Sequence, residues 1–194
     1  SRGLGDVYKR QPLSGTFDFS QIPVFFTDNI NLYYGSSHVK NGTGAIGGSV
    51  NLFTDTDWNR GVNGRVLAEY GSYNTYTVGG QANISGNKSA SKTRLYYQHS
   101  DNDYTYLNKV LTNIPFREKR QDAAYSQFGI MQEGYFRVSP YTRLTAVAWY
   151  QKNHRNLPQP LGVVNRSQED QEENNFRGYA GLDFSRGIHE LHVK

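Results

Sequence analysis

Cysteine is absent from the 194-residue sequence. The chain therefore has no disulfide framework and no thiolate metal site, an absence as compatible with a cytosolic protein as with an exported one. Long apolar runs are absent too, because the longest apolar patch covers only residues 22–26. A transmembrane helix needs roughly 20 apolar residues. If this chain spans a membrane, it must do so as a β-barrel.

Apolar residues and charge of a single sign are both scarce. Hydrophobic residues make up 36% of the chain and the mean hydropathy is −0.73, whereas Tyr, Phe and Gly number 15, 10 and 20. This composition is poor for a helical core and typical of aromatic-rich, half-buried strands. The net charge of +4 comes from intermixed acidic and basic residues. No basic stripe indicates nucleic acid, so we expect no nucleic-acid partner.

An alternation of period two dominates the chain after Trp58. In residues 75–84, Tyr76, Val78 and Ile84 fall on one face of a strand, while Thr77 and Gln81 fall on the other. Such alternation predicts strands with one apolar and one polar face. The apolar face is almost free of charge, as the wall of a barrel requires. About seven strands are predicted, in residues 64–70, 75–84, 93–99, 128–138, 143–150, 176–185 and 191–193.

The connections between these strands alternate in length. Short connections at residues 86–91, 139–141 and 186–187 are separated by long ones at 102–124 and 154–174. Short turns at one end of a meander and long loops at the other are typical of outer-membrane barrels. A β-sandwich has no reason to keep this asymmetry.

Five glycines, in the segment 30–54, precede the predicted strands. Gly42-x-Gly44-x-x-Gly47 fits the spacing of a dinucleotide fingerprint, but that fingerprint requires a helix after its last glycine. Here residues 49–54 alternate as a strand does. Without further information, the glycines indicate turns or close backbone approaches in a β-protein.

This segment resembles the C-terminal end of the plug domain of TonB-dependent outer-membrane receptors, whose recurrent pattern is I-E-V-L-R-G-P-x-S-x-L-Y-G-x-x-A-x-G-G-x-I-N-I. The register holds without a gap, and the matching positions, with Gly44 between them, are Ile30, Gly35, Gly42, Ala45, Gly47, Gly48, Val50, Asn51 and Leu52. The chain departs from the pattern at Asn31, Tyr34, Ser36, Lys40 and Asn41, which replace Glu, Arg, Pro, Leu and Tyr. The family's Glu and Arg help to hold plug to barrel, so that role is not carried over to these positions.

The resemblance implies an all-β fold, an antiparallel meander forming part of a large transmembrane β-barrel and preceded by the end of a plug domain. Residues 12–57 would be the plug part and residues 58–194 the first barrel strands, in the outer membrane of a Gram-negative bacterium. It implies active transport of a scarce, bulky nutrient of the ferric siderophore, haem or cobalamin type. The implied partners are the nutrient, outer-membrane lipid and the inner-membrane protein TonB, acting through an N-terminal box that this chain lacks.

Residues 1–11 are set apart from this prediction. The stretch DVYKRQ at residues 6–11 resembles a translated transposase mosaic-end adapter used in preparing sequencing libraries, and the chain has no initiator Met. We therefore expect a processing scar at residues 1–11, with a native polar linker as the alternative. The chain would then be a piece of a longer protein.

Candidate chemistry is sparse in this sequence. His189 and His192 are three residues apart and point to opposite faces of a strand, which disfavours a shared metal. No nucleophile signature supports an enzyme, and we expect neither a metal nor a cofactor. The acidic run at residues 169–173 is predicted to be a solvated loop. Ligand-facing positions are expected in the plug and in both long loops, 102–124 and 154–174. The individual residues are Ser36, Ser37, His38, Lys40 and Asn41 in the plug and Arg117, Lys119 and Arg120 in the first loop.

Two alternative functions remain open. One is a passive porin or adhesin barrel, for which residues 12–57 would be an ordinary N-terminal extension. The other is a soluble all-β carbohydrate-binding domain, which would need no further strands. Sequence beyond both ends would separate these alternatives from the receptor.

Overall fold

The computed structural model describes residues 22–34, 48–54, 56–110, 114–160, 169–186 and 189–193. Apart from one short 3-10 helix, the regular structure of these residues is antiparallel β-strand, which confirms the predicted all-β class. No helix in these ranges is both long and apolar enough to cross a membrane.

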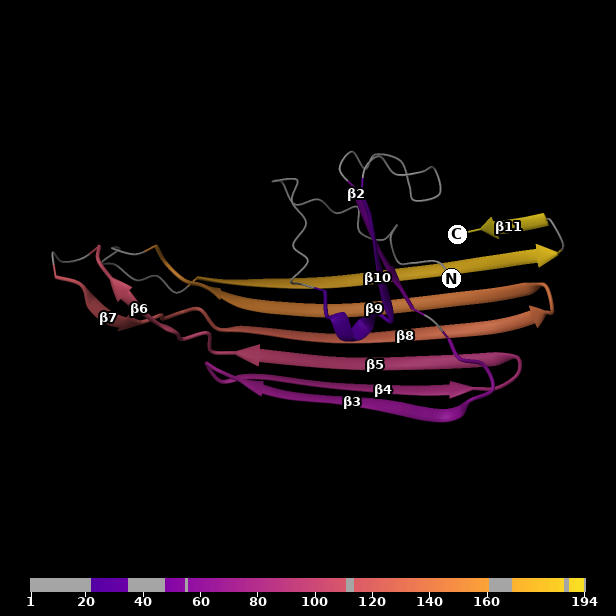
Figure 1. The fold of residues 1–194 in the computed structure, drawn as a ribbon, viewed down its shortest axis with the longest axis horizontal. Helices are drawn as coiled ribbons and strands as arrows, with labels where there is room; N and C mark the ends of the chain where they lie inside the picture. The colour runs from indigo at the N-terminus through magenta and orange to yellow at the C-terminus, as the bar shows by residue number, and fades with distance from the viewer. Residues whose placement is uncertain are drawn as a thin grey trace.

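A seven-stranded sheet dominates the molecule (Figure 1). In space its strands follow the order β11-β10-β9-β8-β5-β4-β3. Strands that are neighbours in this sheet also follow one another along the chain, except that β6 and β7 come between β5 and β8. The sheet is open, with β3 and β11 as its edges among the described residues. The predicted antiparallel meander is therefore confirmed. The strands are β3 (Gly61–Gly71), β4 (Thr75–Ser85), β5 (Ser89–Ser100), β8 (Tyr125–Ser139), β9 (Thr142–Leu157), β10 (Glu169–Arg186) and β11 (His189–Val193).

Two of the predicted loops are wrong in part. The loop expected at 102–124 contains a hairpin of β6 (Thr105–Asn108) and β7 (Phe116–Lys119). The loop expected at 154–174 is shortened from both sides, because β9 and β10 continue into it. The acidic run at 169–173 consequently begins β10 instead of lying in a loop.

Cross-strand polar pairs explain why the second of these regions is strand. Lys152 and Glu172 form an ion pair at 3.0 Å, and Arg155 donates two hydrogen bonds to Gln171 at 2.7 and 3.0 Å. Both partners in each contact are polar, so the extension produces no alternation of hydropathy for sequence analysis to detect.

The N-terminal segment lies over one face of the sheet (Figure 1). It comprises the 3-10 helix η3 (Val24–Phe26) and a two-stranded hairpin of β1 (Asn29–Tyr34) and β2 (Gly48–Phe53). Strand structure after the glycine-rich segment is thus confirmed by β2. Thr54 follows β2 and brings the chain back to the sheet, where its hydroxyl oxygen lies 3.1 Å from that of Tyr135.

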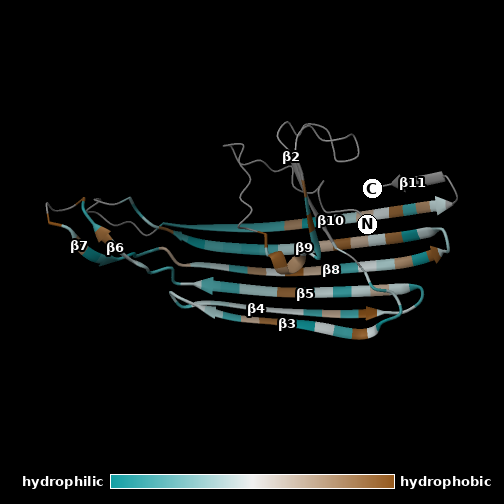
Figure 2. Cartoon of the chain, viewed as in Figure 1, coloured by the Kyte–Doolittle hydropathy of each residue, from teal (hydrophilic) through white to brown (hydrophobic). Residues whose placement is uncertain are grey.

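The two faces of the sheet differ sharply in exposure. The face that carries Arg94, Glu133 and Gln151, here called the polar face, is covered by the N-terminal segment, and these three side chains are at most 1% exposed. The opposite, apolar face is open, since Val66 and Phe176 are 85% and 75% exposed. Figure 2 shows that hydrophilic residues dominate the ends of β9 and β10 nearest the β6–β7 hairpin. The apolar face is therefore limited to part of the strand length.

Candidate functional site: a buried ion-pair cluster beneath the N-terminal segment

Two phenylalanines anchor the N-terminal segment to the polar face. Phe26 is 0% exposed and its ring meets Trp149 edge to face, with centroids 5.4 Å apart. Phe25 stacks on Tyr96 at 6.4 Å, and Phe26 also contacts Tyr96 at 6.1 Å. Met131 and Val147 complete this core. A small hydrophobic core therefore joins η3 to β5, β8 and β9, in the middle of an otherwise polar face.

Two glycines make room for these rings. A Cβ atom at Gly129 would lie 2.7 Å from Cε2 of Phe26, and one at Gly79 would lie 3.1 Å from Cε1 of Phe25. Contacts shorter than normal van der Waals separation force neighbouring groups to move. Gly79 and Gly129 therefore define where η3 docks on the sheet.

Replacement of Gly129 by alanine is expected to loosen the N-terminal segment and to lower the free energy of unfolding by about 1–3 kcal/mol, the usual cost of overpacking. Urea unfolding of the complete protein in lipid vesicles measures the change. Gly134→Ala on the same strand is the matched control, since its nearest neighbour, the carbonyl oxygen of Ala146, would be 3.9 Å away. Equal effects of the two substitutions would contradict the docking role of Gly129.

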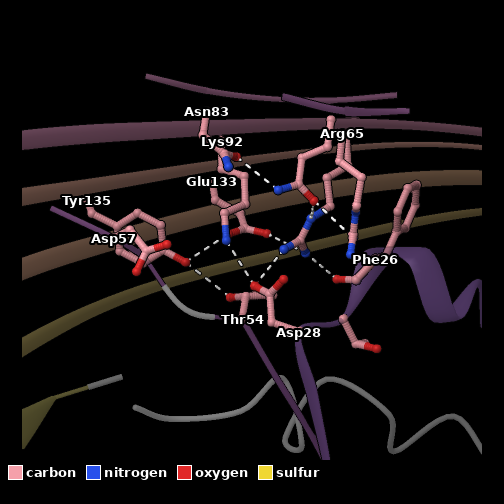
Figure 3. Close-up of polar contacts among 12 residues, drawn as sticks. Phe26, Asp28, Thr54, Asp57, Arg65, Asn83, Lys92, Glu133 and Tyr135 are labelled. Atoms are coloured by element: carbon pink, nitrogen blue, oxygen red, sulfur yellow. Dashed lines mark hydrogen bonds and ion pairs between the residues drawn. The ribbon is translucent and has the colours of Figure 1, made fainter. Parts of the chain in front are cut away.

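A buried polar network joins the N-terminal segment to the sheet, and Figure 3 shows Asp28, Lys92 and Glu133 within it. Arg94 makes the largest number of contacts that we describe in this network. Its guanidinium group is 0% exposed and pairs with Asp28 at 2.6 Å and with Glu133 at 2.9 Å. It also donates to the carbonyl oxygen of Phe26 and, through Nε, to Gln81 at 3.1 Å. One side chain of β5 thus binds both the backbone and a carboxylate of the N-terminal segment.

Lys92 adds a second cation to the same carboxylate. Its ammonium group lies 2.9 Å from Oδ2 of Asp28, and its side chain is only 8% exposed. Lys92 and Arg94 are two residues apart on β5, so both project from the polar face. Together with Asp28 and Glu133 they form a neutral set of two cations and two anions, here called the buried charge cluster.

A second contact joins the end of the N-terminal segment to the cluster. The hydroxyl of Tyr135 donates to Glu133 at 2.7 Å and lies 3.1 Å from the hydroxyl of Thr54. Asp28 precedes β1 and Thr54 follows β2. The β1–β2 hairpin is therefore tied to the seven-stranded sheet at both of its ends.

The cluster is stable only as long as its members stay together. Buried ion pairs contribute little net stability relative to apolar residues, but removal of one partner leaves an uncompensated charge and costs several kcal/mol. Moving Asp28 away from the sheet would remove a carboxylate partner from both Lys92 and Arg94. Water entering the gap would hydrate these groups and offset part of that cost. The ion pairs of the cluster therefore hold the N-terminal segment to the sheet.

Comparison with protein families and with curated proteins adds no information about this cluster. No protein-family model matches the chain, and a search of curated proteins finds no sequence similar to it.

Half of the ten positions of the plug motif lie outside the described residues, namely Gly35, Gly42, Gly44, Ala45 and Gly47. The same holds for the expected ligand-facing positions Ser36, Ser37, His38, Lys40 and Asn41. Gly48 begins β2 opposite Tyr34, and Asn51 pairs with Asn31 across the hairpin. The structure therefore describes five of the ten positions, Ile30 on β1 and Gly48, Val50, Asn51 and Leu52 on β2.

The three remaining predicted ligand-facing residues come together in the β6–β7 hairpin. Arg117 and Lys119 are exposed on β7. Lys119 donates to the carboxylate of Asp103, and this hydrogen bond raises the pKa of the ammonium group. Arg120 donates to the carbonyl oxygen of Gln159 at 3.0 Å, which ties the hairpin to the connection after β9. Two of these cations are therefore already engaged within the chain.

Sequence analysis missed the buried charge cluster. One sequence signal for the β5 side of the cluster is the spacing of Lys92 and Arg94, which are two residues apart. Two charges on one face of a strand indicate a polar environment on that face. Nothing local marks Asp28 as their partner. Among the described residues no group of three or more histidine, cysteine and carboxylate side chains is placed to hold a metal ion.

Proposed function

We propose that this chain belongs to a TonB-dependent outer-membrane receptor, which transports a scarce, bulky nutrient. Residues 22–57 act as the end of the plug, and the seven-stranded sheet is part of the barrel wall. The buried charge cluster holds the plug to the wall until force applied through the inner-membrane partner admits water and releases it. Transport is mechanical and needs no covalent chemistry.

The inverted sheet is the observation that carries the proposal. A soluble protein buries the apolar face of a sheet and exposes the polar one. Here Val62, Val66 and Ile84 are 77%, 85% and 60% exposed on the apolar face, whereas Arg94 and Glu133 are fully buried on the other. Apolar residues outside and polar residues inside are the arrangement of outer-membrane barrels.

The apolar face also has the dimensions of a membrane band. Phe128 to Phe136 on β8 and Phe176 to Phe184 on β10 each span about nine residues, the length with which a tilted strand crosses a bilayer. Directly paired aromatics line one margin of the band, as in the aromatic girdles of barrels. These pairs are Tyr70 with Tyr76, Tyr97 with Phe128, and Tyr150 with Phe176.

Charges on the apolar face begin only beyond this margin. Between the margins, the described strands β3, β4, β5, β8, β9 and β10 place no charged residue on this face. Past the aromatic margin, Lys152 pairs with Glu172 and His154 lies 3.3 Å from Asp170. Gln132 is the one amide within the band on β8, and it is hydrogen-bonded to Thr93 at 2.6 Å and Ser91 at 2.9 Å. Satisfied polar groups are what hydrocarbon tolerates.

Conductance in planar lipid bilayers tests the proposal. The complete protein is expected to insert and remain closed, whereas a variant lacking residues 22–57 is expected to open a large, steady pore, because the segment that covers the polar face is gone. A pore of equal conductance in both proteins would favour a passive channel. Failure of the complete protein to insert would favour a soluble domain.

A further inference from the structure

A pocket of about 550 Å³ lies at the end of the sheet nearest the β6–β7 hairpin. Figure 1 shows that β5 ends, β8 begins, β9 ends and β10 begins at this edge. The pocket is away from the buried charge cluster, and neither the cluster nor the cations of the β6–β7 hairpin line it. In the proposed receptor, this end of the wall is the one with the long connections, which face the cell exterior.

Side-chain amides dominate the polar lining of the pocket. Gln98, Gln127, Asn153 and Gln171 come from four neighbouring strands, and Tyr125 adds an aromatic ring. Each amide has a carbonyl acceptor and an NH₂ donor, so together they can bond groups that both donate and accept. Gln98 is oriented by the hydroxyl of Thr77, to which it donates at 3.1 Å.

Asn153 presents a donor that the fold does not use. Its Oδ1 accepts hydrogen bonds from Gln127 at 3.1 Å and from Gln151 at 3.0 Å. Its Nδ2 is buried and has no partner within the part of the chain that the structure describes. Buried donors are rarely left unpaired, and an acceptor that enters the pocket beside this amide would satisfy it. The two accepted bonds fix the orientation of this amide, so the position of that acceptor is fixed too.

Charge at the pocket is balanced. Arg155 donates from both Nε and Nη2 to Gln171, at 3.0 and 2.7 Å, and Glu173 accepts from Asn175 at 2.8 Å. One permanent cation and one carboxylate line the site, and both are engaged by amides. An anionic ligand would meet no excess of positive charge here.

We infer that this pocket binds an uncharged polyhydroxylated ligand of the oligosaccharide class, with a hydroxyl or ether oxygen accepting from Asn153 Nδ2. Sugar hydroxyls match amides that donate and accept, and Tyr125 offers a ring face to the apolar side of a sugar. The inference rests on the proposed transport function, since it names the class of nutrient that the receptor takes up. The balanced charge of the lining argues against a highly charged ligand such as a ferric complex.

An oligosaccharide array tests the inference. The complete, detergent-solubilised protein is applied to neutral sugars, including maltohexaose, cellohexaose and mannohexaose, beside acidic ones, including oligogalacturonate and sulfated hexasaccharides. Binding to at least one neutral sugar is expected, and calorimetry then gives its affinity. Asn153→Asp keeps the acceptor for Gln127 and Gln151 but removes the free donor, so affinity is expected to fall about tenfold or more.

Two further variants make the result specific. Gln98→Leu, on a neighbouring wall of the pocket, is expected to weaken binding as well. Asn63→Asp is the matched control, because Asn63 also accepts an amide hydrogen bond through Oδ1, from Asn83 at 2.7 Å, but lies on β3 outside the pocket. Its affinity is expected to stay within about twofold of the unmodified protein.

Absence of binding to every neutral sugar, a preference for acidic sugars, or an Asn153→Asp affinity equal to that of Asn63→Asp would each overturn the inference. The bilayer measurement is independent of the array. A closed complete protein that opens on removal of residues 22–57, but binds no neutral sugar, would contradict the ligand class and leave the proposed receptor standing.

Discussion

Replacement of Arg94 by methionine is expected to lower the free energy of unfolding of the complete protein by about 3–5 kcal/mol, the cost of breaking a buried ion pair from one side. Asp28 and Glu133 would lose their shared cation, and the carbonyl oxygen of Phe26 would lose its donor. Urea unfolding in lipid vesicles gives the stability change. Hydrogen exchange of residues 22–34 is expected to accelerate in parallel, because those residues are held by the same contacts.

Arg60→Met is the matched control for this measurement. Arg60 also pairs with an aspartate, Asp57 at 3.0 Å, but the two side chains are 67% and 63% exposed. Exposed pairs typically contribute less than about 1 kcal/mol. If Arg94→Met and Arg60→Met had similar small effects, the buried charge cluster would not hold the N-terminal segment.

Truncation of Phe26 to alanine is expected to have an effect of the same size, about 3–5 kcal/mol, because it empties a fully buried site among aromatic side chains. The ring contacts with Tyr96 and Trp149 would be lost. Hydrogen exchange at η3 and β1 is expected to increase, and in planar bilayers the variant is expected to open intermittently where the unmodified protein stays closed.

Val24→Ala provides the comparison for Phe26→Ala. Both residues belong to η3, but Val24 is 71% exposed whereas Phe26 is 0% exposed. The Val24 variant is expected to differ from the unmodified protein by less than about 0.5 kcal/mol, as surface substitutions do. If the Phe26→Ala protein stayed closed in planar bilayers, as the Val24→Ala protein is expected to, the docking of η3 would not be what keeps the proposed pore closed.

The two anchors differ in how they respond to water. Phe26 is held by hydrophobic packing, which any opening of the interface weakens in proportion to the area exposed. The buried charge cluster weakens once water reaches Lys92 and Arg94, because hydration then replaces their attraction to Asp28, whose own side chain is 22% exposed. A force applied to the N-terminal segment would therefore meet resistance over a short distance and little beyond it. This behaviour suits a plug that must stay closed at rest and release under tension.

The position of the ion pair illustrates the limits of a sequence pattern. The resemblance to the receptor family places plug charges at the positions of Asn31 and Tyr34, which are uncharged here. In the structure, the N-terminal segment is instead paired with the sheet through Asp28, which meets the cations Lys92 and Arg94. The family pattern does not predict the ion pairs of Asp28, because such a contact depends on which charged side chains meet in space.

The ends of the strands were the least predictable part of the fold. Residues 154–157 and 169–174 were expected to be loop, and the β6–β7 hairpin was not foreseen. These segments are polar on both faces, so burial leaves no periodic mark on their sequence. They form strands because cross-strand polar contacts such as Lys152 with Glu172 and Tyr106 with Glu118 replace apolar burial.

The all-β class, the seven strands of the meander and the division of each strand into an apolar and a polar face are all predictable from the amino-acid sequence. Those features follow from side-chain alternation and turn residues, which are local properties of the chain. Burial of the middle of the polar face beneath the N-terminal segment, and the contact of Asp28 with Arg94 from 66 residues away, become visible only in three dimensions. The tertiary structure also decided that four strand ends gather their amides into one pocket. These features depend on strand register and on where η3 docks, and neither is encoded in any single stretch of the chain.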